Sequence, residues 1–239
     1  MEETLRKLKS LRLNEMVNKL GEMERQNSLV RLSPMELLCT LVDAEHDHRQ
    51  NSRITRLKRE AQIKISTASI ADIEYGDHRN LNRDKMTELV TGRYLEHHRN
   101  VLFSGATGVG KTYLISALAN FACMKGISVR YVRISKLMDM MELEKSNGNY
   151  VKFLEKLSKI GLLVLDDLGP DVMSKKQRSF FFDLIEERYM SGSTIVASQL
   201  PAEQWYHLFE DESVADAICD RLFHNASVIN LKGDSMRKK

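Results

Sequence analysis

The sequence contains few of the residues that build disulfide frameworks, disordered tails or membrane spans. Its three cysteines, Cys39, Cys123 and Cys219, are odd in number and widely spaced, which argues against disulfides and a structural zinc site and predicts small buried side chains. Only three prolines and no low-complexity tract argue against disorder. No apolar run approaches the roughly 18 residues that span a bilayer, and no signal-peptide segment opens the chain. We therefore expect a cytoplasmic protein without a membrane partner.

The net charge of the chain says little about its function. The 239 residues include 36 basic and 33 acidic side chains, a formal net charge of +3 that permits nucleic-acid binding but does not establish it. The excess is not concentrated in either half of the chain. Any contact with DNA must therefore come from local clustering of basic side chains.

Helical spacing of apolar residues dominates the first hundred positions. One stripe contains Leu5, Leu8, Leu13, Met16, Val17 and Leu20, and a second begins with Leu37, Leu38, Leu41 and Val42. Ser33-Pro34-Met35-Glu36 supplies an N-cap, a proline at the first helical position and a capping-box glutamate, and so predicts the start of a helix. We expect this helix to run to about Lys64 and residues 1–70 to form a small all-helical domain that contacts DNA or other subunits.

From Val101 onward, short β-rich runs alternate with helical stretches. The predicted strands are Val101–Ser104, Ser128–Arg133, Leu162–Leu165, Thr194–Ala197 and Ser227–Leu231. Ser174 with Gln177 predicts a capped helix between the third and fourth strands. This alternation predicts an α/β fold over residues 71–239 with a mostly parallel five-stranded sheet and its functional edge at the strand C-termini. A joint over Ala68–Arg79 and a helix over Asn82–His97 precede the first strand.

A phosphate-binding loop follows the first predicted strand. The segment Gly105-Ala106-Thr107-Gly108-Val109-Gly110-Lys111-Thr112 fits the pattern Gly-x-x-x-x-Gly-Lys-[Ser/Thr], and a helical run over Tyr113–Lys125 comes next. Glycines allow backbone N–H groups to turn toward phosphates, and the helix directs its positive end at them. Lys111 would reach the β- and γ-phosphates and Thr112 would bind magnesium. A glycine-rich turn that binds nothing is the alternative.

An acidic pair ends the third predicted strand. Asp166 is positioned to hold the magnesium shell, and Asp167 to orient or deprotonate the attacking water. Two carboxylates could instead cap the following turn. The fourth strand ends in Ser198-Gln199, where Ser198 could sense the γ-phosphate or position water. Ser198 could equally be a turn residue, with Gln199 as the reserve candidate.

Hydrolysis at such a site commonly needs an arginine from a neighbouring subunit. Arg221, in Asp220-Arg221-Leu222, is the first candidate, and Arg188, late in the helix before the fourth strand, is the second. For each, the alternative is a surface ion pair of little energetic weight.

Taken together, GATGVGKT, LLVLDD, TIVASQ, DRL and the ending INLKGDSMR resemble the IstB family of transposition helper ATPases, relatives of the DnaC helicase loaders. The N-terminal segments LKSLRLNEMVNKL and LSPMELLCTLVDAE favour IstB over DnaC. The resemblance implies an AAA+ core behind a helical domain, ATP and Mg²⁺ as cofactors, self-assembly on duplex DNA and a partner transposase directed to its target. It also gives Arg221 the role of arginine finger, the residue that reaches a neighbour's γ-phosphate.

Three features of the sequence depart from the family pattern. The acidic motif ends Asp-Asp where Asp-Glu is usual, so the base has a shorter reach and we expect slow intrinsic turnover. Eight residues follow the last predicted strand, which leaves no room for a C-terminal lid domain, and we expect neighbouring subunits to close the site. Met236 stands where an aromatic residue is expected in the Gly-Asp-Ser-x-Arg ending, although Arg237 is retained.

Basic side chains on the long helix are the first candidates for DNA contacts. Arg49, Arg53 and Arg56 share a helix face, with Arg59 nearby, and could contact successive phosphates without reading sequence. A solvated helix face is the alternative. A second group, Lys136, Lys145, Lys152 and Lys156, is interleaved with glutamates and could equally form helical ion pairs.

Other functions share these motifs. A replicative helicase loader of the DnaC kind would prefer single-stranded DNA and bind a helicase. A nucleotide-sensing scaffold would bind ATP with negligible turnover. A small-molecule phosphotransferase would need an arginine-rich lid segment, which the sequence does not display.

Overall fold

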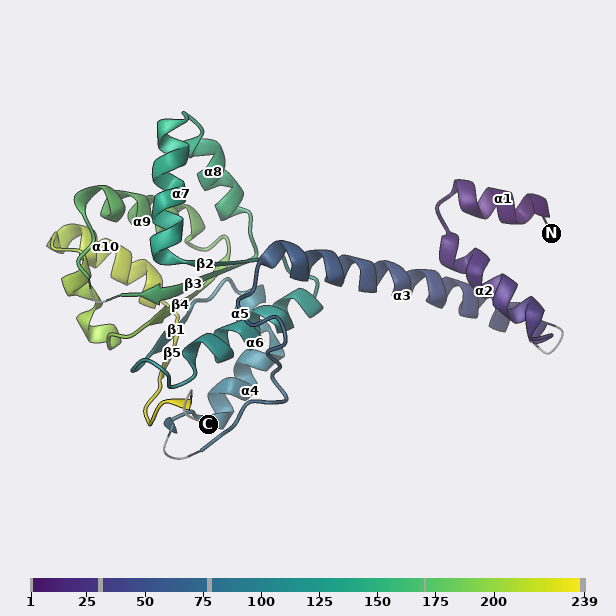
Figure 1. The fold of residues 1–239 in the computed structure, drawn as a ribbon, viewed down its shortest axis with the longest axis horizontal. Helices are drawn as coiled ribbons and strands as arrows, with labels where there is room; N and C mark the ends of the chain where they lie inside the picture. The colour runs from purple at the N-terminus through teal and green to yellow at the C-terminus, as the bar shows by residue number, and fades with distance from the viewer. Residues whose placement is uncertain (1, 30–31, 77–78, 170, 237–239) are drawn as a thin grey trace. The chain divides into compact units, whose positions relative to one another are not determined.

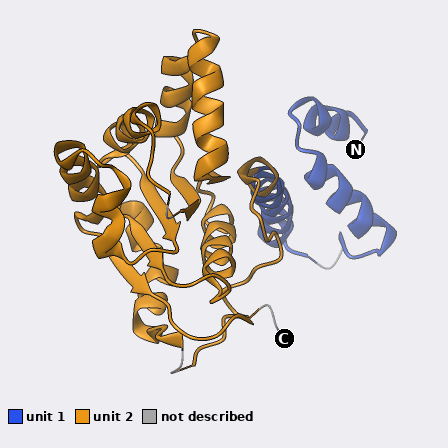
Figure 2. Ribbon diagram, turned by 60° about the vertical axis from the view of Figure 1, so that its left-hand side comes forward, with its two compact units in different colours: residues 1–56 blue, residues 57–239 orange. Residues whose placement is uncertain are grey.

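The computed structural model describes residues 2–29, 32–76, 79–169 and 171–236. The chain divides into two compact units, residues 1–56 and 57–239 (Figure 2). This division lies earlier than the domain boundary expected near residue 70. Leu57, Ala61 and Ala68 account for the difference, because all three are buried in the core that packs against the sheet of the second unit. Among the described residues, none of the helices combines the length and apolarity that crossing a bilayer requires.

Unit 1 consists of helices and buries little. Its elements are α1 (Glu2–Ser10), α2 (Asn14–Arg25) and the first part of α3 (Pro34–Ala61) (Figure 1). The predicted start of α3 is confirmed, because Ser33 and Glu36 exchange hydrogen bonds between side chain and backbone. Among the described residues of this unit, only Met23 and Glu45 are buried.

One face of α3 carries apolar side chains into solvent. Met35, Leu38 and Val42 are 67%, 55% and 45% exposed, and Cys39 lies on the same stripe. The prediction that all three cysteines are buried is therefore wrong for Cys39, because this face has no core beneath it in the single chain. Cys123 and Cys219 are buried as predicted.

Unit 2 is built on a parallel sheet with strand order β2-β3-β4-β1-β5 (Figure 1). In the described residues its strands are β1 (Val101–Ser104), β2 (Val129–Arg133), β3 (Leu162–Leu168), β4 (Ser193–Ser198) and β5 (Ser227–Asn230). All five strands predicted from the sequence are present, with bounds that shift by at most three residues. β1 and β4 are buried along their whole length and β3 is buried except at Asp167, as expected of parallel strands covered on both faces.

Helices cover the two faces of the sheet and form separate cores. The elements between and around the strands are α4 (Arg83–Thr91), α5 (Arg93–Glu96), α6 (Lys111–Met124), α7 (Ile134–Ser146), α8 (Tyr150–Ser158), α9 (Lys175–Arg188), η3 (Ala202–Leu208) and α10 (Glu212–Phe223). One core contains side chains of α4 and α6, and the other contains side chains of α7 to α10. Alternate residues of β1 serve the two cores, since Val101 and Phe103 belong to the first and Leu102 to the second.

Local signals set the helix ends. Ser174 and Gln177 form the predicted capping box at the start of α9. The helix predicted over Asn82–His97 is instead two helices, because Gly92 adopts a left-handed conformation (φ 84°) that ends α4 and starts α5. Asn82 caps α4 by accepting a hydrogen bond from the Lys85 N–H.

Candidate nucleotide site

The loop between β1 and α6 has a backbone that requires glycine. Gly105, Gly108 and Gly110 have φ angles of 139°, 92° and 96°. A Cβ at Gly105 would lie 2.4 Å from the Leu231 carbonyl oxygen, and one at Gly108 would lie 2.3 Å from Ser235 Oγ. The glycines predicted from the phosphate-loop pattern are therefore fixed by both conformation and space.

Lys111 and Thr112 occupy the first turn of α6. The Lys111 ammonium donates to the carbonyl oxygens of Gly105 (2.5 Å) and Ala106 (2.9 Å), so it lies over the loop. Because α6 begins at Lys111, its positive end faces the same space. A loop of this geometry suits the phosphates of a nucleotide.

Asp166 is the centre of a polar cluster at the end of β3. The residue is 3% exposed, and its Oδ2 accepts hydrogen bonds from Tyr131 Oη and, at 3.4 Å, from Thr112 Oγ1. Burial, followed by this bond to Asp166, raises the pKa of Tyr131, so the phenol stays protonated and donates. Lys64 Nζ lies 3.7 Å from the same oxygen.

Asp167 turns away from its neighbour into the solvent-accessible side of the site. It has a φ of 66°, and the pairing of β3 with β4 shifts register between Leu165 and Leu168. Left-handed backbone at a residue other than glycine is costly and is often retained at functional sites. Gln199 Nε2 donates to Asp167 Oδ1 at 3.3 Å, and Thr107 Oγ1 donates to Gln199 Oε1 at 3.0 Å. These bonds link the acidic pair to the phosphate loop.

The prediction for Ser198 does not fit this geometry. Ser198 is fully buried, and its hydroxyl donates to the Leu168 carbonyl (2.8 Å) while accepting from the Leu200 N–H (3.0 Å). Gln199, the reserve candidate, directly follows β4 and lines the cavity, where its amide donates to Asp167. Ser198 ends β4, and its bond to the Leu200 N–H agrees with the alternative interpretation, in which it shapes the following turn.

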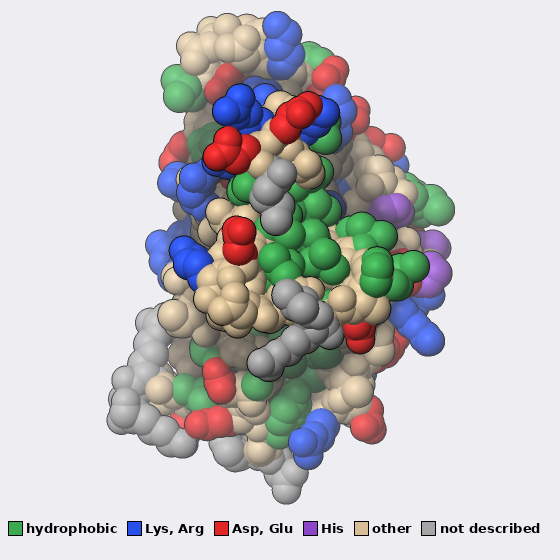
Figure 3. Space-filling view, turned by 90° about the vertical axis from the view of Figure 1, so that its right-hand side faces the viewer, with side chains coloured by type: hydrophobic (Ala, Val, Ile, Leu, Met, Phe, Trp, Pro, Cys, Tyr) green, Lys and Arg blue, Asp and Glu red, His purple; other side chains and the backbone are tan. Residues whose placement is uncertain are grey.

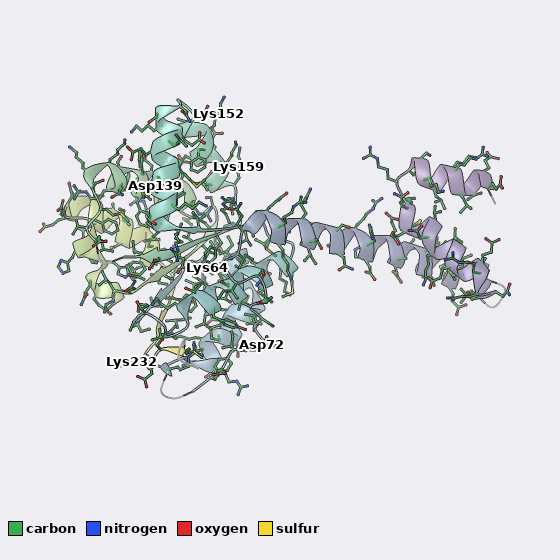
Figure 4. The ribbon with its side chains drawn as sticks, viewed as in Figure 1. Lys64, Asp72, Asp139, Lys152, Lys159 and Lys232 are labelled. Atoms are coloured by element: carbon green, nitrogen blue, oxygen red, sulfur yellow. The ribbon has the colours of Figure 1, made fainter. Side chains whose placement is uncertain are left out.

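These groups surround a cavity of about 700 Å³. Its lining includes the predicted residues Thr107, Gly108, Gly110, Lys111, Thr112, Asp166 and Asp167. It also includes Gln199 and Met236, which the sequence analysis considered, and residues to which it gave no role in the site: Lys64, Ile65, Asp72, Glu74, Arg79, Tyr113 and Arg133. Lys64 and Asp72 are labelled in Figure 4.

Arg79 closes one side of the cavity. It is 5% exposed, and its guanidinium donates to the carbonyl oxygens of Glu74 and, at 3.1 Å, of Val109 in the phosphate loop. The segment that we predicted only as a joint therefore builds one wall of the site. No spacing pattern in the sequence could have indicated this, because the contact is made between distant parts of the chain.

A magnesium ion fits the donors at Thr112 and Asp166 together with nucleotide phosphates. The two side-chain oxygens lie 3.4 Å apart, and hydroxyl and carboxylate oxygens are ligands that Mg²⁺ prefers. Within the described ranges, His, Cys, Asp and Glu side chains nowhere gather in a group of three that could hold a metal ion alone. Phosphate oxygens would thus have to supply part of the coordination.

The two candidate arginines differ sharply in environment. Arg188 is 2% exposed, and its guanidinium donates to Thr194 Oγ1 and to the carbonyl oxygens of Leu157, Ser158, Ile160 and Ser193. Burial lowers its pKa to about 10, so it remains charged at neutral pH. A side chain held this way cannot reach another subunit, and Arg188 is therefore structural rather than a candidate for the arginine finger.

Arg221 remains near the surface. It lies by the start of β1, whereas the phosphate loop follows the end of β1. Arg221 lies near the end of α10, forms an ion pair with Glu186 and packs beside the rings of Phe182 and Tyr189. Asn100, which directly precedes β1, donates to the Arg221 carbonyl oxygen at 3.1 Å. The strand β1 therefore separates Arg221 from the phosphate loop of its own chain.

The basic residues predicted to contact DNA lie on exposed surface. Arg49, Arg53, Arg56 and Arg59 are all exposed on α3. Arg49 also pairs with Glu45 at 2.8 Å and donates to the Arg12 carbonyl oxygen. In the second group, Lys145 packs over the rings of Tyr150 and Phe180. Arg237 lies outside the described residues.

A five-stranded parallel sheet with a phosphate loop after β1 and an acidic pair at the end of β3 defines an ATP-binding P-loop protein of the AAA+ fold. The family model described as IstB-like ATP binding protein matches residues 6–239. The chain belongs to this family.

Relatives cover nearly the whole chain. It is 33% identical over 235 residues to an insertion sequence ATP-binding protein of Sinorhizobium fredii, covering 98% of this chain and 96% of the relative. It is 31% identical over 240 residues to the IS21 ATP-binding protein of Pseudomonas aeruginosa, covering 100% of this chain and 89% of that one. Both alignments include the helical unit as well as the ATP-binding unit.

Solved structures share the fold at lower identity. The DnaI crystal structure aligns with a TM-score of 0.58 and 23% identity, covering 70% of this chain and 92% of that one. The DnaC helicase loader aligns with a TM-score of 0.58 and 20% identity, covering 69% and 97%. These similarities concern the fold alone.

Proposed function

We propose that this protein is an ATP-hydrolysing transposition helper that assembles on duplex DNA and directs a partner transposase to its target. ATP binding would order the assembly, and hydrolysis after the transposase engages would release it. The insertion sequence relatives support the link to transposition. The observation that carries the proposal is the convergence of Lys111, Thr112, Asp166 and Asp167 on one cavity.

The nucleotide-site residues in the cavity can each be given a role from their positions. Lys111 and the loop N–H groups would bind the phosphates, and Thr112 with Asp166 would hold magnesium, which would supply charge neutralisation at the transferred phosphate. Asp167 orients or deprotonates the attacking water. Gln199, hydrogen-bonded to Asp167, takes the sensing role first considered for Ser198. Arg221 of a neighbouring subunit would complete the site.

Unit 1 supplies surfaces suited to assembly. Among the described residues of unit 1, the large exposed apolar side chains are Leu11, Met35, Leu38 and Val42. Figure 3 shows a patch of hydrophobic side chains at the surface. Because a small helical unit with so few buried residues gains stability by covering such a face, we expect a second copy of the chain to pack there. The exposed arginines of α3 would contact phosphates of duplex DNA.

The fold similarity to DnaI and DnaC supports a second candidate, a replicative helicase loader. Such a protein would assemble on single-stranded DNA and bind a helicase in place of a transposase. A nucleotide-sensing scaffold is a third candidate, because Asp167 has a shorter reach than glutamate and turnover could be negligible.

The mass distribution of the purified protein distinguishes these functions. It would be measured with ATP, with ADP and without nucleotide, each with duplex or single-stranded DNA. Large ATP-dependent assemblies on duplex DNA are the expected result, and Asp167→Asn should still form them while losing turnover. Assembly confined to single strands would favour the loader, and no assembly with either DNA would favour the scaffold.

A further inference from the structure

The segment that follows α3 carries a lysine into the nucleotide cavity. Gln62 has a left-handed backbone (φ 53°), and the helix ends just before it at Ala61. Ile63 and Ile65 then pack against the core beside the sheet. Lys64, between these two anchors, lines the cavity (Figure 4).

The position of this segment is fixed relative to the phosphate-loop helix. Asn120, a 4% exposed residue of α6, donates its side-chain amide to the carbonyl oxygens of Ile65 (3.3 Å) and Ala68 (2.9 Å). The same helix begins at Lys111. Two partly buried isoleucines and two hydrogen bonds therefore hold the backbone that contains Lys64 beside the phosphate-loop helix.

Lys64 is paired with the carboxylate that we assign to the metal shell. Its Nζ lies 3.7 Å from Asp166 Oδ2, the oxygen that also accepts from Tyr131 and Thr112. The Asp166 side chain is 5% exposed and that of Lys64 is 37% exposed, so the ion pair is partly shielded from water. A lysine ammonium and a divalent cation near Thr112 would compete for this one oxygen.

We propose that Lys64 is a positioning residue whose ammonium competes with magnesium for Asp166 and so sets the metal requirement for nucleotide binding. The inference rests on the proposed function, since it needs a magnesium nucleotide in this cavity. With the metal bound, like-charge repulsion favours moving the Lys64 ammonium from Asp166 to phosphate oxygens of the nucleotide. The exchange would occur three residues beyond the end of α3, at the base of the helix that carries the candidate DNA contacts.

Magnesium titrations of nucleotide binding test this directly. A fluorescent ATP analogue would be titrated with the full-length chain, with Lys64→Gln and with Lys64→Arg, and the magnesium concentration at half-maximal binding would be read. We expect Lys64→Gln to lower that concentration by about fivefold or more, within the usual range of coupling between binding events. In EDTA the same variant should bind the analogue more weakly than the wild type, because a positive charge has been lost. Lys64→Arg should behave as the wild type in both conditions.

Lys159→Gln is the matched control. It removes one lysine charge from an exposed site at the end of α8, outside the cavity (Figure 4), and should leave the magnesium midpoint unchanged. An unshifted magnesium midpoint for Lys64→Gln would overturn the proposal. A lower melting temperature with the midpoint unchanged would also overturn it, because the role of Lys64 would then be structural. Lys111→Ala separates this failure from that of the proposed function. If Lys111→Ala binds the analogue as well as the wild type, the cavity is not the nucleotide site and both proposals fail.

Discussion

At the scale of single residues, one carboxylate oxygen organises the site. Asp166 Oδ2 is contacted by a phenol, a hydroxyl and an ammonium, which come from β2, α6 and the segment after α3. A buried carboxylate with several donors has a fixed orientation, and outer-shell donors of this kind tune a metal site. Tyr131 is the donor of this set that lies deepest in the core, since it is 6% exposed.

Replacing Tyr131 with phenylalanine should impair turnover more than folding. The change removes one hydrogen bond to Asp166 but keeps the ring packing, and we expect ATP turnover to fall about 10- to 100-fold, as for other outer-shell changes. Steady-state kcat and KM would be measured beside a denaturant melt. Tyr150→Phe is the control, because its hydroxyl donates to Asp183 at 2.6 Å outside the cavity. Equal losses of turnover in both variants would contradict the role of Tyr131.

A second residue-scale contrast separates Arg188 from Arg221. Arg188 holds the end of α8 to the start of β4 through backbone carbonyl groups, whereas Arg221 makes an ion pair with Glu186 near the surface. Removing a buried donor leaves its acceptors without partners, while a partly exposed ion pair contributes little. The two substitutions should therefore differ in which property they damage.

We expect Arg188→Met to destabilise the fold by about 3 kcal/mol or more, because several buried carbonyl groups lose their donor. Arg221→Ala should cost about 1 kcal/mol or less. Urea unfolding of both variants beside the wild type measures the difference. A wild-type midpoint for Arg188→Met would mean that water or neighbouring groups satisfy those carbonyls.

At the scale of elements, the strands and the phosphate loop could be predicted because each is defined by a pattern of consecutive residues. Buried parallel strands read as unbroken apolar runs, and the loop and acidic pair follow two of them directly. Lys64, Tyr131 and Arg79 could not be predicted, because each reaches the site only through packing between distant segments. The choice between Ser198 and Gln199 depended on side-chain contacts at the end of β4, because Ser198 bonds to backbone groups and Gln199 bonds to Asp167 and Thr107.

The helix α3 joins a core segment to an exposed one. Leu57 and Ala61, near its end, are buried in unit 2, while Arg53 and Arg56 are exposed in unit 1. Spacing of three residues places the two arginines on one side of the helix. An exposed pair of this kind can contact neighbouring phosphates.

Neutralising Arg53 and Arg56 together should weaken duplex binding about tenfold and flatten its salt dependence. Each lost phosphate contact reduces the slope of log K against log salt by about one, so the pair should reduce it by about two. Binding would be measured over a salt series. The double variant Lys9→Gln with Arg25→Gln removes the same charge from exposed positions outside α3 and serves as control. An unchanged slope for the α3 variant would exclude this face.

At the scale of the whole molecule, each unit has a feature that the proposed assembly would use. Unit 1 exposes an apolar stripe that its own few buried residues do not cover. In unit 2 the phosphate loop follows the end of β1 and Arg221 lies by its start, so the Arg221 guanidinium is separated from the nucleotide site of its own chain by the length of that strand. Both features are expected of a protein whose active form is an assembly.

Mixing two inactive variants tests whether neighbouring chains share one site. Arg221→Ala keeps an intact phosphate loop and Lys111→Ala keeps an intact arginine, and each alone should lose about a thousandfold or more in turnover. In an equal mixture, about a quarter of the interfaces pair a working loop with a working arginine. Turnover should therefore recover to about a quarter of the wild-type rate. If Lys111→Ala subunits do not enter the assembly, Asp167→Asn, which we expect to retain ATP binding, replaces them. Mixed assemblies of confirmed composition that remain inactive would show that Arg221 does not act across the interface, and the site would then have to be completed within one chain.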